Sequence, residues 1–413
     1  MPAIPRKIAQ RVVDALDDTR VVVILGPRQA GKTTLVRSLA PTHGARTYVT
    51  LDDHPTRTLA QSDPDGFIAN LALPVAIDEV QRAPSILLSI KARVDRAPDP
   101  GAFLLTGSAN LLASGVVADA LPGRAEYIRL WPFAQGELSG QQTTLIDRLV
   151  DGEPPRLTEQ PIGLAAYAEL VVRGGFPDVQ ARSASRRVDY FASYLATRLG
   201  IDLADVAGDR VSAATARRLF RLLAARSGEL ANYANLASAA QISAPTARRY
   251  VELLEELFLV QVARPWGANL GNREIRSPKL LVSDSGLLAA TVGADAARIA
   301  SDGGLAGRLV ETFAYNEVVR LCGWSAVRVA EVGFFRDRDG REVDIVVELL
   351  DGRIIAFEVK AAATLGRSDG RGLRYLRDRL GERFVAGAVL HAGATTLPIS
   401  DRIWALPLSA LWS

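Results

Sequence analysis

The chain has 413 residues and a formal net charge of +3, with one cysteine and three histidines. This length allows roughly two to four domains, each with a core of its own. The single Cys322 excludes an intramolecular disulfide, and three scattered histidines exclude Cys/His zinc sites and disfavour a histidine-based triad. No apolar stretch reaches the roughly 18 residues of a membrane span and the start lacks a signal-peptide core, so we expect a cytoplasmic protein without membrane contact.

Residues 21–34, VVVILGPRQAGKTT, combine a β-branched run, a glycine-bearing loop and the start of a helix. This pattern predicts a phosphate-binding P-loop. Its glycines let the backbone wrap a triphosphate, its lysine reaches the β- and γ-phosphates, and the first threonine hydroxyl is placed to ligate Mg²⁺. The residues predicted to bind ATP are Gly26, Pro27, Arg28, Gln29, Ala30, Gly31, Lys32, Thr33 and Thr34.

Arginine has replaced lysine almost everywhere. Of 49 Lys and Arg residues, five are lysines: Lys7, Lys32, Lys91, Lys279 and Lys360. A lysine carries a compact charge on a flexible stem, which suits a phosphate or an activated water better than a planar guanidinium does. Because Lys32 and Lys360 lie inside motifs that suggest catalysis, we expect a function for each.

Strand-like runs follow the loop at 47–51, 75–77, 103–106 and 127–130, with helical stretches between them. This alternation predicts an α/β fold in which a parallel sheet is covered by helices on both faces.

The run at 75–77 ends in Asp78 and Glu79, which is the form of a Walker B strand. A P-loop needs such a partner, because one carboxylate completes the Mg²⁺ shell and the next orients the attacking water. We therefore assign Asp78 to the nucleotide and its Mg²⁺, and Glu79 to catalysis. A strand that ends in solvated acids is the alternative interpretation.

The segment LLTGSAN at 104–110 places Thr106, Ser108 and Asn110 just past a strand, where an ATPase of the ASCE class carries a polar sensor of the γ-phosphate. Any of the three could serve, and Ser108 is the catalytic candidate, although turn chemistry alone also favours this composition. Arg124, in LPGR, is a candidate arginine finger, in cis or from a neighbouring subunit of a homo-oligomer. A surface arginine after a Pro-Gly turn is the alternative.

Further short motifs follow in a definite order along most of the chain: PRKIA at 5–9, GPRQAGKTTL at 26–35, AIDEVQRAP at 76–84, LLTGSAN, LPGR, RGGFPDV at 173–179, YVELLEELFLV at 250–260, SPKLLVSDSGL at 277–287, EVDIVVE at 342–348 and AFEVK at 356–360. In these segments the chain resembles prokaryotic AAA-like ATPases that carry an uncharacterised C-terminal domain. The resemblance implies an ATP-binding protein and supplies no physiological substrate.

The middle of the chain begins with a predicted linker at 141–160, which contains two consecutive prolines. Three helices are expected at 219–226, 233–241 and 246–257, and a strand at 259–263, which is the order of a winged helix. Ser243 is expected to cap the third helix.

The third of these helices carries Arg248 and Arg249, which suggest DNA contact, but its exposed face also carries Glu252, Glu255 and Glu256. Carboxylates near phosphates are unfavourable, so a connector or protein-contact role is preferred over DNA reading. Gly174, Gly175 and Pro177 are expected to shape a turn, and no role follows for Asp284.

Near the C-terminus, 342–362 reads as two strands joined at Asp351-Gly352, a hairpin signal. Asp344 lies in the first strand, Glu358 and Lys360 lie two apart in the second, and Glu311 lies on a helix over 309–321. In register, the hairpin would bring these charges together, which an apolar sheet rarely does without a purpose. A solvated hairpin with alternating charges is the alternative.

This constellation resembles the PD-(D/E)xK nuclease core, although the proline is missing before Asp344. The resemblance implies that Asp344, Glu358 and Glu311 bind Mg²⁺ and that Lys360 positions or activates water, with DNA or RNA as the substrate.

The expected organisation is a P-loop AAA-type ATPase domain at 1–140, the linker, a winged-helix-like connector at 161–298 and a restriction-endonuclease-like domain at 299–413. Its expected function is ATP hydrolysis that gates the nuclease or its nucleic-acid contact. The alternative is a nucleotide-switched adaptor that binds a protein partner through an inactive nuclease fold.

Overall fold

The computed structural model describes residues 4–41, 45–108, 121–140, 144–152, 162–207, 211–267 and 277–413. The chain divides into two compact units: Met1–Phe133 with Glu256–Phe258, and Ala134–Glu255 with Leu259–Ser413. Among the described helices, none is long and apolar enough to cross a membrane.

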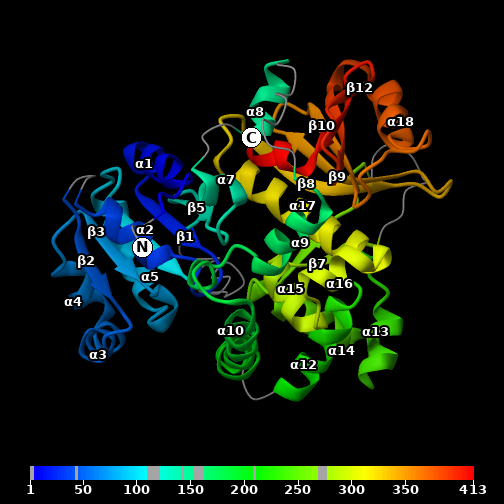
Figure 1. The fold of residues 1–413 in the computed structure, drawn as a ribbon. Helices are drawn as coiled ribbons and strands as arrows, with labels where there is room; N and C mark the ends of the chain where they lie inside the picture. Colours follow the sequence, from blue (N-terminus) through cyan, green and yellow to red (C-terminus); the bar gives the residue numbers. More distant parts are fainter. Residues whose placement is uncertain are drawn as a thin grey trace. The chain divides into compact units, whose positions relative to one another are not determined.

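A five-stranded parallel sheet forms the centre of the first unit, in the order β2-β3-β4-β1-β5 (Figure 1). Its strands are β1 (Val21–Leu25), β2 (Thr47–Thr50), β3 (Val75–Asp78), β4 (Phe103–Gly107) and β5 (Ala125–Arg129). The predicted parallel sheet is thus confirmed. Because β4 lies between β1 and β3, the P-loop strand and the predicted Walker B strand are separated by the strand that carries the sensor candidates.

Apolar side chains explain why these segments form a buried sheet. All residues of β1, β3 and β4 are buried, as parallel strands covered on both faces require. The helices of this unit are α1 (Ala9–Asp18), α2 (Lys32–Leu39), α3 (His54–Ser62), α4 (Pro64–Ala69) and α5 (Ile86–Arg96). Helices α4 and α5 contribute Phe67, Ile86 and Ile90 to the same core as β1.

The second unit begins with helices, and one of them lies inside the predicted linker. Helix α8 (Leu145–Val150) lies within 141–160, and its Leu145, Ile146 and Leu149 are buried. The remaining helices of this part are α7 (Gln135–Ser139), α9 (Leu164–Arg173), α10 (Ala184–Thr197), α11 (Leu203–Ala207), α15 (Ser285–Val292), α16 (Ala296–Ser301) and α17 (Gly303–Trp324).

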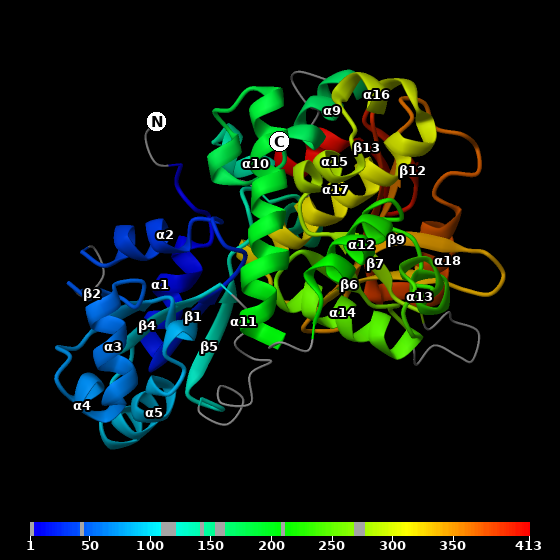
Figure 2. The same cartoon turned by 90° about the horizontal axis from the view of Figure 1, so that it is seen from below.

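Three helices and a small sheet stand in the region predicted as a winged helix. They are α12 (Ala213–Ala224), α13 (Tyr233–Ala240), α14 (Ala244–Glu256) and the antiparallel strands β6 (Val260–Ala263) and β7 (Lys279–Val282), grouped together in Figure 2. Ser243 accepts a hydrogen bond from Thr246 N at 3.2 Å, as the capping prediction requires. The helix-helix-helix-strand order agrees with the prediction, and the winged-helix assignment itself stays a prediction.

A mixed six-stranded sheet completes the second unit, in the order β12-β13-β11-β10-β9-β8. Its strands are β8 (Val329–Arg336), β9 (Glu342–Leu349), β10 (Ile354–Lys360), β11 (Phe384–His391), β12 (Leu397–Ser400) and β13 (Ile403–Pro407). The predicted hairpin is present as β9 and β10, which pair antiparallel. Helix α18 (Arg371–Leu380) packs Leu373, Leu376 and Leu380 against one face of this sheet.

Candidate functional site

The predicted P-loop connects β1 to α2, as its sequence required. Gly31 adopts φ +97°, a left-handed conformation that favours glycine, and α2 begins at the next residue. Lys32 is buried, and its Nζ donates to Gly26 O at 2.9 Å and to Pro27 O at 2.8 Å. The Lys32 side chain therefore folds back over the P-loop, the same loop that would bind the phosphates.

Gly26 has a second reason to be glycine that the sequence did not reveal. A Cβ at this position would lie 2.0 Å from Leu130 O, the carbonyl that follows β5. Real Cβ atoms do not approach backbone oxygen so closely, so the packing of the loop against β5 excludes a side chain here even before a nucleotide is considered.

The P-loop threonine and the predicted Walker B aspartate are in direct contact. Thr33 Oγ1 donates to Asp78 Oδ2 at 2.8 Å, and the Tyr48 hydroxyl donates to the same oxygen at 2.9 Å. Thr106, from β4, donates to the other carboxylate oxygen, Oδ1. A hydroxyl and a carboxylate brought together beside a P-loop are the hard oxygen ligands that Mg²⁺ prefers, so these residues fit the ion that accompanies ATP.

Glu79 lies next to Asp78 in a left-handed conformation, φ 60°, which is unusual for a residue with a side chain. Its backbone N donates to Thr106 Oγ1 at 2.9 Å, and its carboxylate accepts from Ser108 Oγ at 3.2 Å. Gln81 donates to both the Glu79 carboxylate and Ser108 Oγ, the latter at 2.8 Å. Ser108 and Glu79 are thus brought together. Gln81, which was not predicted from the sequence, joins them and stands two residues after Glu79.

Arg124 lies beside a carboxylate rather than free in solvent. Its Nε and Nη2 donate to the two oxygens of Asp95, on α5, at 2.6 and 2.9 Å, and its Nη1 donates to Pro122 O at 3.0 Å. A finger role in cis or in trans would first require this bidentate pair to open. Asn110, the third sensor candidate, lies outside the described residues.

In the second unit, Glu311 and Asp344 meet at a lysine that the sequence analysis left without a role. Lys279, at the start of β7, places its Nζ 2.7 Å from Glu311 Oε1, 2.8 Å from Glu342 Oε1 and 3.4 Å from Asp344 Oδ1. The Phe334 ring lies on a further side, with its centroid 5.4 Å from Nζ. We call Lys279, Glu311, Glu342 and Asp344 the Lys279 cluster.

Glu358 and Lys360 form a second ion pair beside the Lys279 cluster. Glu358 Oε1 lies 2.8 Å from Lys360 Nζ, and Oε2 accepts from Gly370 N at 3.0 Å, just before α18. Asp369 Oδ1 lies 4.0 Å from the same ammonium. Glu311 and Asp344 therefore share Lys279 as a partner, whereas Glu358 pairs with Lys360. The two pairs are neighbours, because Asp344 Oδ2 accepts the N–H of Val359, which lies between Glu358 and Lys360.

An irregularity in β9 explains this division. Val343 and Val346 belong to the same core on the α18 side of the sheet, although residues three apart in a regular strand face opposite sides. The pairing of β8 with β9 shifts between Gly333 and Phe335, and the pairing of β9 with β10 ends at Ile345 and Phe357. Beyond that point the Asp344 carboxylate accepts the Val359 N–H, at 2.8 Å.

The electrostatics of the Lys279 cluster favour a charged lysine. Burial lowers the pKa of Lys279, but Glu311, Asp344 and Glu342 outweigh it and the net shift is upward. Burial, followed by Asp344, raises the pKa of Glu311 to about 7 against the pull of Lys279. The cluster is thus held together by one buried cation.

A metal ion at the four predicted C-terminal residues does not fit these contacts. The space between Glu311 and Asp344 holds an ammonium, and both oxygens of Glu358 are bonded to Lys360 and Gly370. Across the described ranges, no group of three or more His, Cys, Asp or Glu side chains is placed to hold a metal ion.

Asp284, to which no role was assigned from the sequence, accepts four hydrogen bonds and is fully buried. Its donors are the backbone N–H groups of Gly175, Gly286 and Leu287 at 2.8 to 3.1 Å, and Arg320 Nη2 at 3.1 Å. A Cβ on Gly174 would lie 2.2 Å from Asp284 Oδ1, so a side chain at this position would collide with the carboxylate.

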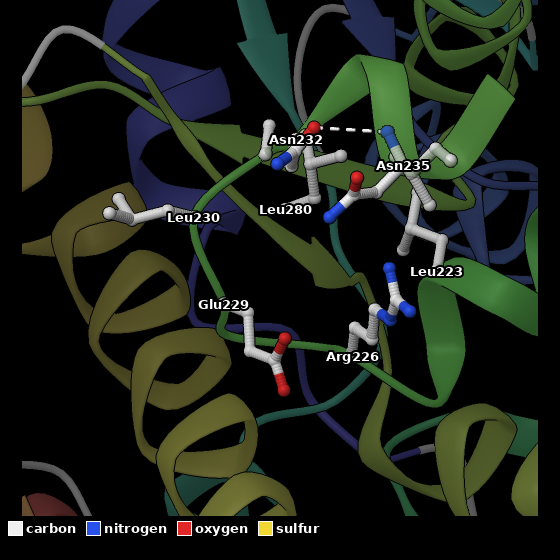
Figure 3. Close-up of a pocket in the computed structure, with 9 residues that line it drawn as sticks. Leu223, Arg226, Glu229, Leu230, Asn232, Asn235 and Leu280 are labelled. Atoms are coloured by element: carbon white, nitrogen blue, oxygen red, sulfur yellow. Dashed lines mark hydrogen bonds between the residues drawn. The ribbon is translucent and has the colours of Figure 1, made fainter. Parts of the chain in front are cut away.

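A cavity of about 310 Å³ is lined in part by Leu280, the residue that follows Lys279 on β7. Figure 3 shows Arg226 and Glu229 on one side of it and Asn232 and Asn235 on the other, with Leu280 in its wall. Successive side chains of a strand point to opposite faces, so Leu280 faces the cavity while Lys279 faces the carboxylates.

Comparison with known proteins agrees with this geometry. Residues 18–139 match the AAA domain family, and 164–298 and 306–411 match two domains of unknown function, DUF8612 and DUF4143. Uncharacterized protein Rv2008c of Mycobacterium tuberculosis and uncharacterized protein Mb2031c of Mycobacterium bovis are each 32% identical over 404 residues, covering 97% of this chain and 83% of their own.

Among solved structures, the Walker-type ATPase PABY2304 of Pyrococcus abyssi matches at 14% identity, TM-score 0.41, with 70% of this chain and 96% of that chain covered. The RuvB Holliday junction branch migration motor of Thermotoga maritima matches at 20% identity, TM-score 0.32, with 64% and 90% covered. The ATPase assignment depends on the AAA domain match and the P-loop geometry rather than on these distant likenesses.

Proposed function

This chain belongs to the family of the two mycobacterial proteins and carries an AAA-like P-loop ATPase domain, and on that premise we propose that it hydrolyses ATP to control a C-terminal domain that contacts nucleic acid. The observation that carries the ATPase part is the Thr33–Asp78 hydrogen bond at 2.8 Å beside Lys32, with Glu79 next in the chain.

In the proposed reaction, Lys32 leaves its two loop carbonyls and binds the β- and γ-phosphates, where it offsets charge that develops during transfer. Thr33 and Asp78 would hold Mg²⁺, which neutralises phosphate charge. Glu79 orients the attacking water. Ser108 and Gln81 are bonded to Glu79, which supports a role for both in fixing its carboxylate and in sensing the γ-phosphate.

Two variants test the ATPase proposal. Lys32→Ala removes a phosphate ligand and should abolish ATP binding, measured by nucleotide titration. Glu79→Gln keeps shape and leaves Asp78 in place, so it should bind ATP but release phosphate at least about 100-fold more slowly. Normal phosphate release by Glu79→Gln would show that the Walker B assignment is wrong.

For the C-terminal domain, the proposed contact is with DNA or RNA, and cleavage by Asp344, Glu358, Glu311 and Lys360 would be its active form. Cleavage requires an open position for a metal ion, and the ammonium of Lys279 fills that position. With Lys279 in that position, these residues lack the open metal site that cleavage needs.

The second candidate function is a nucleotide-switched adaptor that binds a protein partner. The internal neutralisation of Glu311 and Asp344 by Lys279 favours it, because a fold whose acids are already paired can bind without cutting.

An assay of the full chain against single-stranded DNA, duplex DNA and RNA, with Mg²⁺ or Mn²⁺ and with or without ATP, separates the two candidates. Cleavage that Lys360→Ala abolishes supports the nuclease form. Binding without cleavage supports a nucleic-acid contact, and neither binding nor cleavage leaves the adaptor as the better proposal.

A further inference from the structure

The ammonium group of Lys279 has a carboxylate oxygen available for each of its three N–H donors. An ammonium has three donors, and three carboxylate oxygens lie 2.7, 2.8 and 3.4 Å from Nζ. Its side chain is 4% exposed, and the Phe334 ring covers it from another direction. Lys279, one of the five lysines in this chain, is thus a buried cation surrounded by carboxylates.

The backbone that carries Lys279 is fixed on both edges. On one edge β7 pairs with β6, Lys279 opposite Ala263. On the other edge Lys279 forms a bridge with Leu230, and Gly228 N donates to Leu280 O at 2.9 Å. The ammonium is therefore held in place from a rigid strand rather than reaching in from a mobile loop.

Gly228 also borders the cluster, and its backbone conformation favours glycine. It adopts φ +88°, and a Cβ there would lie 3.4 Å from the carboxyl group of Glu311. The same turn that holds β7 thus borders the carboxylate that Lys279 binds most closely. The middle region at 164–298 and the C-terminal region at 306–411 meet at this cluster.

We propose that Lys279 is the resident cation of the cluster: its ammonium takes the place that a nuclease-type site would give to a divalent ion, and keeps such an ion away from Glu311 and Asp344. This proposal rests on the acidic constellation of the proposed C-terminal function and is independent of the ATPase part.

Distances and charge support the exclusion. Mg²⁺ needs oxygens at about 2.0–2.1 Å in octahedral geometry, whereas an ammonium holds them at about 2.7–2.9 Å. Asp344 Oδ2 is engaged by Val359 N at 2.8 Å, and Glu342 Oε2 lies 3.3 Å from Arg336 Nη1. A divalent ion would have to displace Lys279 and break these contacts, while a positive charge a few ångströms away repels it.

The test measures thermal stability of the full chain, without nucleotide, with and without Mn²⁺. The variants are Lys279→Met, the double variant Lys279→Met with Asp344→Asn, Asp344→Asn alone, and Lys91→Met as a control on α5 in the other unit. In wild type, Mn²⁺ should produce no rise in Tm that depends on Asp344.

Lys279→Met leaves buried carboxylates without their cation and should lower Tm by about 5–10 °C. Mn²⁺ should then recover at least about half of that loss, because the vacated position accepts a cation. The double variant should lose the Mn²⁺ recovery, and Lys91→Met should match wild type in both conditions.

Three outcomes would overturn the proposal. They are an unchanged Tm in Lys279→Met, a loss of Tm that Mn²⁺ does not recover, or a Mn²⁺-dependent rise of Tm in wild type that Asp344→Asn abolishes. The last comparison uses wild type and Asp344→Asn, so it decides even if Lys279→Met does not fold. That result would also strengthen the nuclease candidate, whereas a failure of the ATPase proposal would appear in the Glu79→Gln assay and leave this Tm series unaffected.

Discussion

At the scale of single residues, the second unit contains buried carboxylates that have different partners. Asp284 receives four donors, whereas Glu317 accepts from Gln135 N and Arg320, each at 2.8 Å. Arg320 joins the two acids, since its Nη2 binds Asp284 at 3.1 Å. The Arg320 guanidinium thus neutralises both buried acids. Replacing each acid should have its own measurable effect.

Asp284→Ala should lower the free energy of unfolding by about 3–5 kcal/mol, because it leaves Arg320 and three backbone N–H groups unsatisfied in the interior. Asp302 is a matched control, since it also caps a helix, by accepting from Leu305 N at 3.0 Å, but is exposed. Asp302→Ala should cost about 1 kcal/mol. Equal losses in chemical denaturation would contradict the role given to Asp284.

Glu317 should make stability depend on pH. Burial raises the pKa of Glu317 from 4.5 to about 7, against the opposing effects of Arg320 and Gln135 N. The folded state then binds more protons than the unfolded state, so the free energy of unfolding should fall as pH rises through this range, by at most about 1.4 kcal/mol per pH unit.

Glu317→Gln should remove this contribution, whereas Glu382→Gln, at an exposed carboxylate, should retain it. Denaturant unfolding of the three proteins between about pH 4.5 and 7 provides the measurement. A wild-type slope that Glu317→Gln leaves unchanged would assign the pH dependence to other groups.

At the scale of elements, helix α14 bears on nucleic-acid contact. The Arg248 guanidinium lies 4.7 Å from the centre of the Tyr233 ring, and Arg249 Nη1 lies 3.5 Å from Glu252 Oε2. Both arginines are already occupied at the protein surface. The connector role of α14 stays a prediction, which these contacts favour.

Changing Arg248 and Arg249 together to Ala should therefore leave nucleic-acid affinity and its salt slope nearly unchanged, if the full chain binds nucleic acid at all. Binding measured over a range of salt concentrations tests this. A salt slope reduced by about two units, one for each lost phosphate contact, would instead place α14 on DNA.

The sequence predicted an element correctly where the pattern that specifies it is contiguous along the chain. The P-loop, β3 with Asp78 and Glu79, and the β9–β10 hairpin follow from contiguous patterns, and the structure places them as expected. Helix α8 was missed because the polar and proline residues around it outweighed a short apolar stretch. Its burial depends on partners far away in the sequence.

The division of the C-terminal residues could not be predicted for a related reason. A regular hairpin places Asp344 and Glu358 on one face, and only the irregularity of β9 separates their partners. Lys279 stands 32 and 65 residues before Glu311 and Asp344, respectively, so no local pattern joins them. Lysine is rare in this chain, and this rarity was the signal that could have drawn attention to Lys279.

At the scale of the whole molecule, a finger role of Arg124 in trans would depend on assembly into an oligomer. Within the chain it is held by Asp95. If Arg124 completes a neighbouring subunit's site, phosphate release per chain should rise with protein concentration, because the site forms only in an oligomer.

Mixing Arg124→Ala chains with Lys32→Ala chains should then restore part of the lost activity, because mixed pairs contain one intact P-loop facing one intact arginine. Homogeneous samples of each variant are the controls. If sedimentation shows that mixed oligomers form and phosphate release stays at the level of the separate variants, a trans finger is excluded.

The two faces of β7 have a consequence for how the chain folds. Apart from Lys279, the strand consists of Leu280, Leu281 and Val282, apolar residues that could exchange places at little cost. A slip by one residue would turn Lys279 towards the cavity and leave Glu311 facing a leucine. The misaligned strand would thus bury acids without their cation, so one lysine disfavours a one-residue slip in this small sheet.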